Sequence, residues 1–180
     1  MEKNLNLNTL KDYKKILVIG CPGSGKSTLS DKLSKMLNLN LVHLDKIFWK
    51  PNWLNVTAKE FDEKLAIELK KDSWIIDGNY KRTLNTRISY CDLIIYLDLD
   101  SQTCLNSYYN RVKTKEISIK GYISEGCIEE IDEEFVNYIK DFNANHQKEL
   151  YELVRASNKD YIIFHSRKEV ENFINKKGEI

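Results

Sequence analysis

Nine consecutive residues near the start of the chain have the types and spacing that bind a nucleoside triphosphate. They match the pattern G-x-x-x-x-G-K-[ST], and they are Gly20, Cys21, Pro22, Gly23, Ser24, Gly25, Lys26, Ser27 and Thr28. Glycine lets the backbone curl until its N–H groups face phosphate oxygens, and a helix that begins near Lys26 adds the positive end of its dipole. We expect Lys26 to neutralise the β- and γ-phosphates and Ser27 to hold Mg²⁺. A plain glycine turn between strand and helix would leave the Lys-Ser pair unexplained.

Two carboxylates follow apolar runs and suit the remaining steps of phosphoryl transfer. Asp77 ends one run, where a carboxylate can order water around a Mg²⁺ that Ser27 contacts. Asp45 follows another and has the chemistry of a general base for a substrate hydroxyl. Each also has a structural interpretation, Asp77 as a turn cap and Asp45 as a helix cap or lysine partner. His43 is expected to be a packed core histidine.

Aromatic and cationic side chains beyond these strands offer a site for a phosphate acceptor. Phe48, Trp49 and Trp53 would form a platform for a flat acceptor such as a nucleobase, although core packing explains them nearly as well. Arg82 and Arg87 lie on one predicted helix and would grip phosphate in bidentate fashion, with solvated surface arginines as the alternative.

The segment from 111 to 126 is basic and flanked by glycine, and it lies between two predicted helices. This is the position of a lid, which we predict over about 113–126. A closing lid excludes water and brings cations to the γ-phosphate. A plain helix connection is the alternative, but it would be longer than the usual length of about 2 to 8 residues.

The elements that must position these residues alternate between β-branched runs and helical patterns. The candidate strands cover 15–19, 39–44, 74–77, 93–98 and 161–165. Their consecutive apolar residues indicate strands buried on both faces, as in a parallel sheet covered by helices. The pattern predicts an α/β fold of three layers, with a doubly wound, five-stranded parallel sheet whose ligands bind at the carboxyl ends of the strands. We expect one domain over 1–180, with a leader over 1–14.

Apolar stripes at helical spacing predict the covering helices. Stripes run over 29–37, 61–69, 105–112 and 170–174, and the second and last follow the capping boxes Thr57-x-x-Glu60 and Ser166-x-x-Glu169. A longer stripe over 128–154 indicates one helix of about 30 residues, or two with a bend.

Charge and composition limit the classes of partner. The chain has 28 basic and 27 acidic residues and a formal net charge of +1, so no global field favours nucleic acid or an anionic membrane. No apolar run has the length of a membrane span, and the polar segment 1–8 lacks the core of a signal peptide. We therefore expect a cytoplasmic protein with reduced cysteines, no membrane partner and no direct nucleic-acid binding. The oligomeric state stays open.

Together these motifs resemble a known group of kinases. The glycine loop, the five-strand pattern, Asp77-Gly78 and the position of the lid are similar to the P-loop kinases related to adenylate and shikimate kinases. More specifically, the chain resembles the topology modulation proteins, often called FlaR-like. The residues that carry this resemblance are 43–53 and 74–80, then Thr83, Leu84 and Arg87, and finally 126–129 with Asp132 and Phe135. The similarity covers nearly the whole chain after Lys14.

The resemblance implies the P-loop NTPase fold of nucleotide kinases with a lid insertion, and binding of ATP with Mg²⁺. Arg111 matches the position from which adenylate-kinase relatives contact ATP, and Arg87 matches an arginine that the family places before its fourth strand. Asp-Gly-Asn at 77–79 departs from the Asp-Gly-Phe-Pro-Arg of adenylate kinases, which removes an arginine that grips an acceptor monophosphate. A nucleoside or other hydroxyl acceptor is therefore favoured over a nucleotide.

These inferences predict an ATP- and Mg²⁺-dependent phosphotransferase that acts on a small acceptor. The predicted acceptor pocket consists of Asp45, Trp49, Trp53, Asn79 and Arg87, and the catalytic residues are Lys26, Asp45, Arg87 and Arg111. The alternative is an ATP-binding regulatory protein that affects DNA topology with little or no turnover. Direct DNA binding is a third hypothesis, which the balanced charge disfavours. The acceptor and the choice between ATP and GTP stay open.

Overall fold

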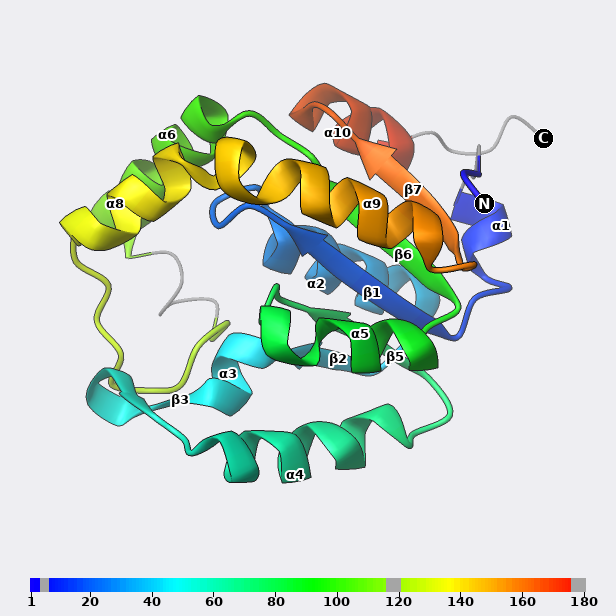
Figure 1. Cartoon of the computed structure of the whole chain (residues 1–180), viewed down its shortest axis with the longest axis horizontal. Coiled ribbons are helices and arrows are strands. Elements are labelled where there is room, and N and C mark those ends of the chain that lie inside the picture. Colours follow the sequence, from blue (N-terminus) through cyan, green and yellow to red (C-terminus); the bar gives the residue numbers. More distant parts are fainter. Residues whose placement is uncertain (4–6, 116–120, 176–180) are drawn as a thin grey trace.

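The computed structural model describes residues 1–3, 7–115 and 121–175. Its centre is a five-stranded sheet in the order β2-β5-β1-β6-β7, with every neighbouring pair parallel (Figure 1). The strands are β1 (Lys15–Gly20), β2 (Leu41–His43), β5 (Trp74–Asp77), β6 (Leu93–Leu97) and β7 (Asp160–Phe164). The predicted fold class is confirmed, and β2 is shorter than the run 39–44 because only three of its residues pair with β5.

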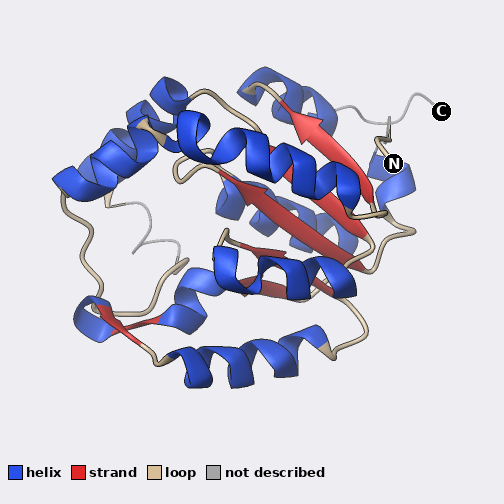
Figure 2. Ribbon diagram, in the orientation of Figure 1, coloured by secondary structure: helices blue, strands red, loops and turns tan. Residues whose placement is uncertain are grey.

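The strands are buried on both faces, as their apolar runs predict. All residues of β5 and β6 are buried, and so are those of β1 after Lys15. Figure 2 shows helices on both sides of the sheet, and Figure 1 shows α5 (Lys81–Tyr90) and α9 (Lys148–Ala156) in front of it and α2 (Lys26–Leu37) behind. This is the layering that shields a parallel sheet from water.

The topology gathers strand ends at one edge of the sheet. β1 is the central strand and pairs with both β5 and β6, so the chain crosses over it on the way from β5 to β6. Such crossover points are where open α/β sheets bind ligands. The register places His43 beside Asp77, and Asp77 beside Val18.

The other helices are α1 (Leu7–Leu10), α3 (Leu44–Phe48), α4 (Ala58–Leu69), α6 (Ser101–Thr114), α8 (Glu133–Lys140) and α10 (Arg167–Asn175). The capping box predicted at Thr57 forms in full, whereas the one predicted at Ser166 forms in part. Thr57 accepts from the Glu60 N–H while the Glu60 carboxylate accepts from the Thr57 N–H. At α10 the Ser166 hydroxyl accepts from the Glu169 N–H, and the Glu169 carboxylate reaches the N–H of His165. None of the described helices has the length and hydropathy to cross a membrane.

The stripe over 128–154 does not form one long helix. Asp132 caps α8 by accepting from the Glu134 N–H at 2.9 Å, so the helix begins at Glu133. A wide π-helical turn over Asn143–Gln147 then joins α8 to α9, which agrees with the bend that the sequence left open. Ile128 and Ile131 precede the helix and are 65% and 61% exposed. These first two residues of the predicted stripe therefore do not belong to the core.

An arm after α3 was not predicted. It consists of β3 (Trp49–Lys50), a 3-10 turn over Pro51–Trp53 and β4 (Leu54–Asn55), and the two strands pair antiparallel. The lid predicted over about 113–126 includes 116–120, which lie outside the described residues.

The segment predicted as a leader packs against the domain edge at β7. Glu2 forms a parallel bridge with Tyr161, and the Tyr13 hydroxyl donates to Asp160 at 2.9 Å. Leu10 is fully buried in the hydrophobic core. These residues therefore contribute to the fold.

Candidate active site

The glycine-rich loop joins β1 to α2 in the strand–loop–helix arrangement that the motif requires. Gly23 and Gly25 have φ values of 82° and 97°, which favour glycine. A Cβ at Gly23 would lie 2.3 Å from the carbonyl oxygen of Cys104, so α6 packs directly against the loop. Glycine is thus needed here for close packing as well as for curvature.

Lys26 is the first residue of α2, and its side chain reaches back to the start of the loop. Its Nζ donates to the carbonyls of Gly20 and Cys21, each at 2.9 Å. Burial lowers the pKa of Lys26. No side chain caps the start of α2 at Gly25, so the helix end with its N–H groups is left for a ligand.

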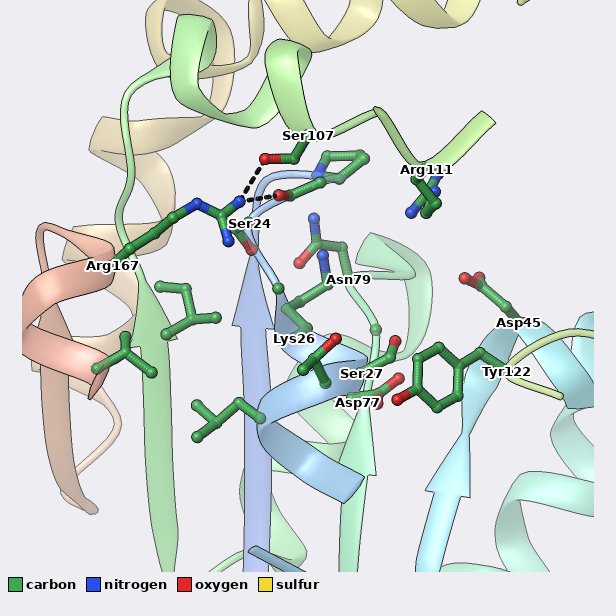
Figure 3. Close-up of a pocket in the computed structure, with 18 of the residues that line it drawn as sticks. Ser24, Lys26, Ser27, Asp45, Asp77, Asn79, Ser107, Arg111, Tyr122 and Arg167 are labelled. Atoms are coloured by element: carbon green, nitrogen blue, oxygen red, sulfur yellow. Dashed lines mark hydrogen bonds between the residues drawn. The ribbon is translucent and has the colours of Figure 1, made fainter. Parts of the chain in front are cut away.

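A cavity of about 450 Å³ lies over this loop. The predicted site residues that line it are Pro22, Gly23, Ser24, Gly25, Lys26, Ser27, Thr28, Asp45, Asp77, Asn79 and Arg111. Figure 3 shows Arg167 and Ser107 on one side of the loop and Asp45, Asp77 and Tyr122 on the other. The cavity therefore has two ends, with the phosphate-binding loop between them.

Gly20 and Cys21 lie behind the cavity. The Cys21 side chain is 1% exposed and hydrogen-bonds with the thiol of Cys104, which together with burial raises the pKa of Cys21. The predicted contribution of these two residues to nucleotide binding is restricted to their backbone, whose carbonyls hold Lys26.

Asp77 is paired with a histidine. The Nδ1 atom of His43 lies 2.7 Å from Asp77 Oδ2, and the side chains are 10% and 4% exposed. The His43 ring also lies 4.9 Å from the Tyr122 ring, centroid to centroid. His43 is thus packed as expected, but it also orients a carboxylate that faces the cavity.

The oxygen atoms of Ser27 and Asp77 fit a magnesium ion. Mg²⁺ is usually held by one or two protein oxygens together with substrate phosphates and water. Among the described residues no group of three or more His, Cys, Asp or Glu side chains could form a complete metal cage. A hydroxyl and one carboxylate beside a phosphate-binding loop are therefore the appropriate donor set.

Asp45 lies in the first turn of α3, where its Oδ1 accepts from the Tyr80 hydroxyl at 2.7 Å. Burial raises the pKa of Asp45, and the charge of Asp77 raises it further. Lys50, a lysine close to Asp45 in the sequence, is instead bonded to Glu60 at 3.1 Å.

Arg111 enters the cavity from α6 and is held by Glu129. Its Nε donates to Glu129 Oε2 at 2.9 Å, and its Nη2 donates to Oε1 of the same carboxylate. Burial raises the pKa of Glu129, although the Arg111 charge opposes this shift. The guanidinium also lies 5.5 Å from the Tyr108 ring centroid. Arg111 is therefore fixed in orientation before any ligand arrives.

The structure does not bring Arg87 into the acceptor pocket. Its guanidinium is fully buried and donates to the carbonyls of Gly78 at 2.7 Å, Tyr80 at 3.0 Å and Asn79. These carbonyls belong to the irregular turn between β5 and α5, where Tyr80 has a φ of 32°. Arg87 thus satisfies the backbone carbonyls of that turn and stabilises it.

Asn79 faces the phosphate-binding loop. Its Oδ1 accepts from the Gly20 N–H at 3.0 Å, and its Nδ2 donates to the Gly20 carbonyl at 2.7 Å. The amide thus pairs with both backbone groups of one glycine. Although Asn79 lines the cavity, its polar atoms hold the loop and are already engaged.

Trp49 and Trp53 also lie away from the cavity. Their rings pack edge to face at 5.3 Å, and Trp53 Nε1 donates to the Ile128 carbonyl at 2.7 Å. Ser124 Oγ donates to the Trp49 carbonyl, and Cys127 Sγ donates to that of Lys50. The two tryptophans join the arm to residues 122–128, so the predicted nucleobase platform is not present.

The sequence did not single out several groups that line the cavity. Arg167 donates to the Gly23 carbonyl at 2.9 Å and to Ser107 Oγ. Apolar side chains of α8 and α10 also line the cavity, namely Phe135, Tyr138, Val170 and Ile174. The only signal for Arg167 was its position after the last strand, because the partners that give it a role are distant in sequence.

Three relatives place the chain among known proteins. It is 36% identical over 124 residues to an adenylate kinase of Ureaplasma parvum serovar 3, an alignment that covers 54% of this chain and 58% of that protein. It is 27% identical over 182 residues to a protein of Sulfurisphaera tokodaii that is provisionally named an adenylate kinase, covering 88% and 90% of the two chains. The structure of shikimate kinase from Acinetobacter baumannii in complex with shikimate matches with a TM-score of 0.60 at 14% identity, covering 94% and 93%.

The aligned region spans less than two thirds of the Ureaplasma protein. The match to the shikimate kinase structure shows the fold, which is that of P-loop kinases. A protein-family model described as AAA domain matches residues 16–116, more than half of the chain, and this range contains the glycine-rich loop, Asp45 and Asp77. The chain therefore belongs to the AAA domain family and has the α/β fold of the P-loop kinases.

Proposed function

We propose that this protein is an ATP- and Mg²⁺-dependent kinase that transfers phosphate to a small molecule. The observation that carries the proposal is that Lys26, Asp45 and Asp77, which come from three different elements, line one cavity over the phosphate-binding loop. The similarity to adenylate kinases supports the same reaction class.

The residues fit the parts that phosphoryl transfer needs. Lys26 and the N-terminus of α2 would bind the β- and γ-phosphates, and Arg111 would bind phosphate with the guanidinium edge that Glu129 leaves open. Ser27 and Asp77 would hold Mg²⁺, which supplies positive charge to the transferred group when bound. Asp45 would accept the proton of the acceptor hydroxyl.

Acceptor-dependent ADP release tests this proposal. We expect the protein with ATP and Mg²⁺ to release ADP faster when its acceptor is supplied from a panel of nucleosides, nucleotides and small alcohols. Lys26→Ala should abolish this release and keep the folded CD spectrum. Lys35→Ala is the matched control, because Lys35 is an exposed residue of the same helix. ATP binding with no acceptor-dependent release would contradict the kinase and favour a nucleotide-binding regulator.

The finer assignment to the topology modulation proteins remains a prediction. It depends on the Asp-Gly-Asn-Tyr turn at 77–80 and on the segments 43–53 and 126–129. The lid over about 113–126, the single domain over 1–180 and the cytoplasmic location are likewise predictions. The relatives and the solved structure that the chain resembles are kinases, so we do not propose an effect on DNA topology.

A further inference from the structure

The acceptor end of the cavity is the side with Asp45 and Tyr122, opposite Arg167 (Figure 3), and Tyr80 also lines the cavity. Asp45 faces the open space there, and its Oδ1 is bonded to the Tyr80 hydroxyl. Asp77 also lines the cavity on this side, but its carboxylate would be shared with Mg²⁺, so Asp45 is the carboxylate left to face the acceptor. A group that enters this end therefore meets negative charge first.

The two arginines of α5 do not offset this charge. Arg87 is buried, and its guanidinium donates to three backbone carbonyls. Arg82 lies on the surface, where it forms a bidentate pair with Asp62 at 2.7 and 2.9 Å. Neither residue lines the cavity.

The cations that line the cavity in the described part of the chain also have other roles. Lys26 and Arg167 hold carbonyls of the phosphate-binding loop, and Arg111 is bonded to Glu129. Lys32 is an exposed residue of α2. Lys26 and Arg111 are close enough to lower the pKa of Asp45, but Arg111 is paired with the Glu129 carboxylate and Lys26 is bonded to the loop.

A phosphate acceptor is the least suited to this arrangement. When a nucleoside monophosphate is phosphorylated, the anionic oxygen itself attacks, so the phosphate would have to lie against Asp45. Like charges a few ångströms apart repel each other in a partly solvated site. A hydroxyl, in contrast, can donate its hydrogen to the Asp45 carboxylate.

We propose that the acceptor is a hydroxyl compound with no phosphate or carboxylate, bound with that hydroxyl at Asp45 and an apolar face on Tyr122. This inference rests on the proposed kinase function. The acceptor oxygen forms a bond to the γ-phosphorus of ATP, the bond from that phosphorus to the β–γ bridging oxygen breaks, and ADP leaves. The hydroxyl proton passes to the Asp45 carboxylate. The products are a phosphate monoester and ADP.

Matched acceptor pairs that differ only in an anionic group test the inference. The pairs are adenosine with AMP, and methyl shikimate with shikimate. We expect acceptor-dependent ADP release with a neutral member, and a kcat/KM at least about tenfold above that of its anionic partner. A higher kcat/KM for AMP or shikimate would overturn the inference and leave the kinase function standing. No acceptor-dependent release with any member, while ATP still binds, would overturn both.

Charge removal at the acceptor end gives a second measurement. Asp45→Asn should lower the rate with hydroxyl acceptors and reduce the ratio of neutral to anionic kcat/KM at least about fivefold, because the repelling charge is gone. Glu63→Gln is the control, since Glu63 is an exposed carboxylate on α4, outside the cavity, and should leave the ratio unchanged. An unchanged ratio in Asp45→Asn would contradict the proposed origin of the selectivity.

Discussion

At the scale of single residues, the site depends on side chains that hold other groups in place. Asn79 pairs with Gly20, His43 orients Asp77, and Glu129 fixes Arg111. We expect Asp77 and Arg111 to meet metal and phosphate, and Gly20 holds Lys26 through its carbonyl. Such preorganisation lowers the cost of arranging the site when the ligand binds.

Asn79→Ala should weaken ATP binding roughly tenfold, because the N–H and carbonyl of Gly20 would lose the amide that pairs with both, and a buried hydrogen bond contributes about 1 kcal/mol. Calorimetric titration with ATP measures the change. Asn106→Ala is the control, as Asn106 is an exposed residue of α6. A normal ATP affinity together with a raised acceptor KM would instead restore Asn79 to the acceptor pocket.

Asp45→Asn should make the protein more stable at pH 7 while it slows transfer. Burial raises the pKa of Asp45 in the folded protein, so the folded state binds more protons than the unfolded state between the two pKa values. The wild type therefore loses stability as pH rises through that interval, and the variant does not. Melting temperatures at pH 4 and pH 7 should show a gain for the variant that is larger at pH 7. An equal Tm difference at both pH values would contradict a raised pKa of Asp45 in the folded protein.

At the scale of elements, two connections are held by contacts to backbone carbonyls. Arg87 supports the turn between β5 and α5, and the arm over 49–55 is bonded to residues 124–128. Both connections carry cavity residues next to them, because Asn79 lies in the turn and Asp45 precedes the arm. The position of the site therefore depends on these supports.

Arg87→Leu should lower the free energy of unfolding by at least about 3 kcal/mol, since three carbonyls would lose a charged donor and each unsatisfied buried group costs about 1–3 kcal/mol. Denaturant titration measures the loss. Arg82→Leu on the same helix breaks only a surface ion pair and should change stability by less than about 1 kcal/mol. Wild-type stability in Arg87→Leu, with acceptor KM raised, would support the phosphate-gripping role predicted from the sequence.

At the scale of the whole molecule, the core extends to the first residues of the chain. Leu10 packs within the hydrophobic core and has no solvent-accessible surface, while Glu2 and Tyr13 contact β7. Leu10→Ala should destabilise the protein by about 2–5 kcal/mol. Leu54→Ala is the matched control, because Leu54 is 64% exposed and should have little effect. Equal Tm values for the two variants would show that residues 1–14 are a dispensable leader.

Local patterns were sufficient to predict the sheet, the capping box at Thr57 and the glycine-rich loop. Each depends on residues close in sequence, such as the apolar run before Gly20 or the three-residue spacing of Thr57 and Glu60. The partners of Arg87 and Trp53 are backbone carbonyls, which any residue type supplies, so composition and spacing carry no trace of them. The sequence for this reason assigned both side chains to the acceptor pocket.

The bonds between the arm and residues 124–128 limit how far the arm can be altered without disturbing Arg111. Trp53 is tied to Ile128, the residue directly before Glu129, and Glu129 holds Arg111. A graft that replaces 49–55 with the corresponding stretch of another kinase would remove the bond from Trp53 to Ile128. Glu129, which holds Arg111, would then be less firmly positioned. Any redesign of the arm in this protein will therefore have to restore the support of Arg111 as well.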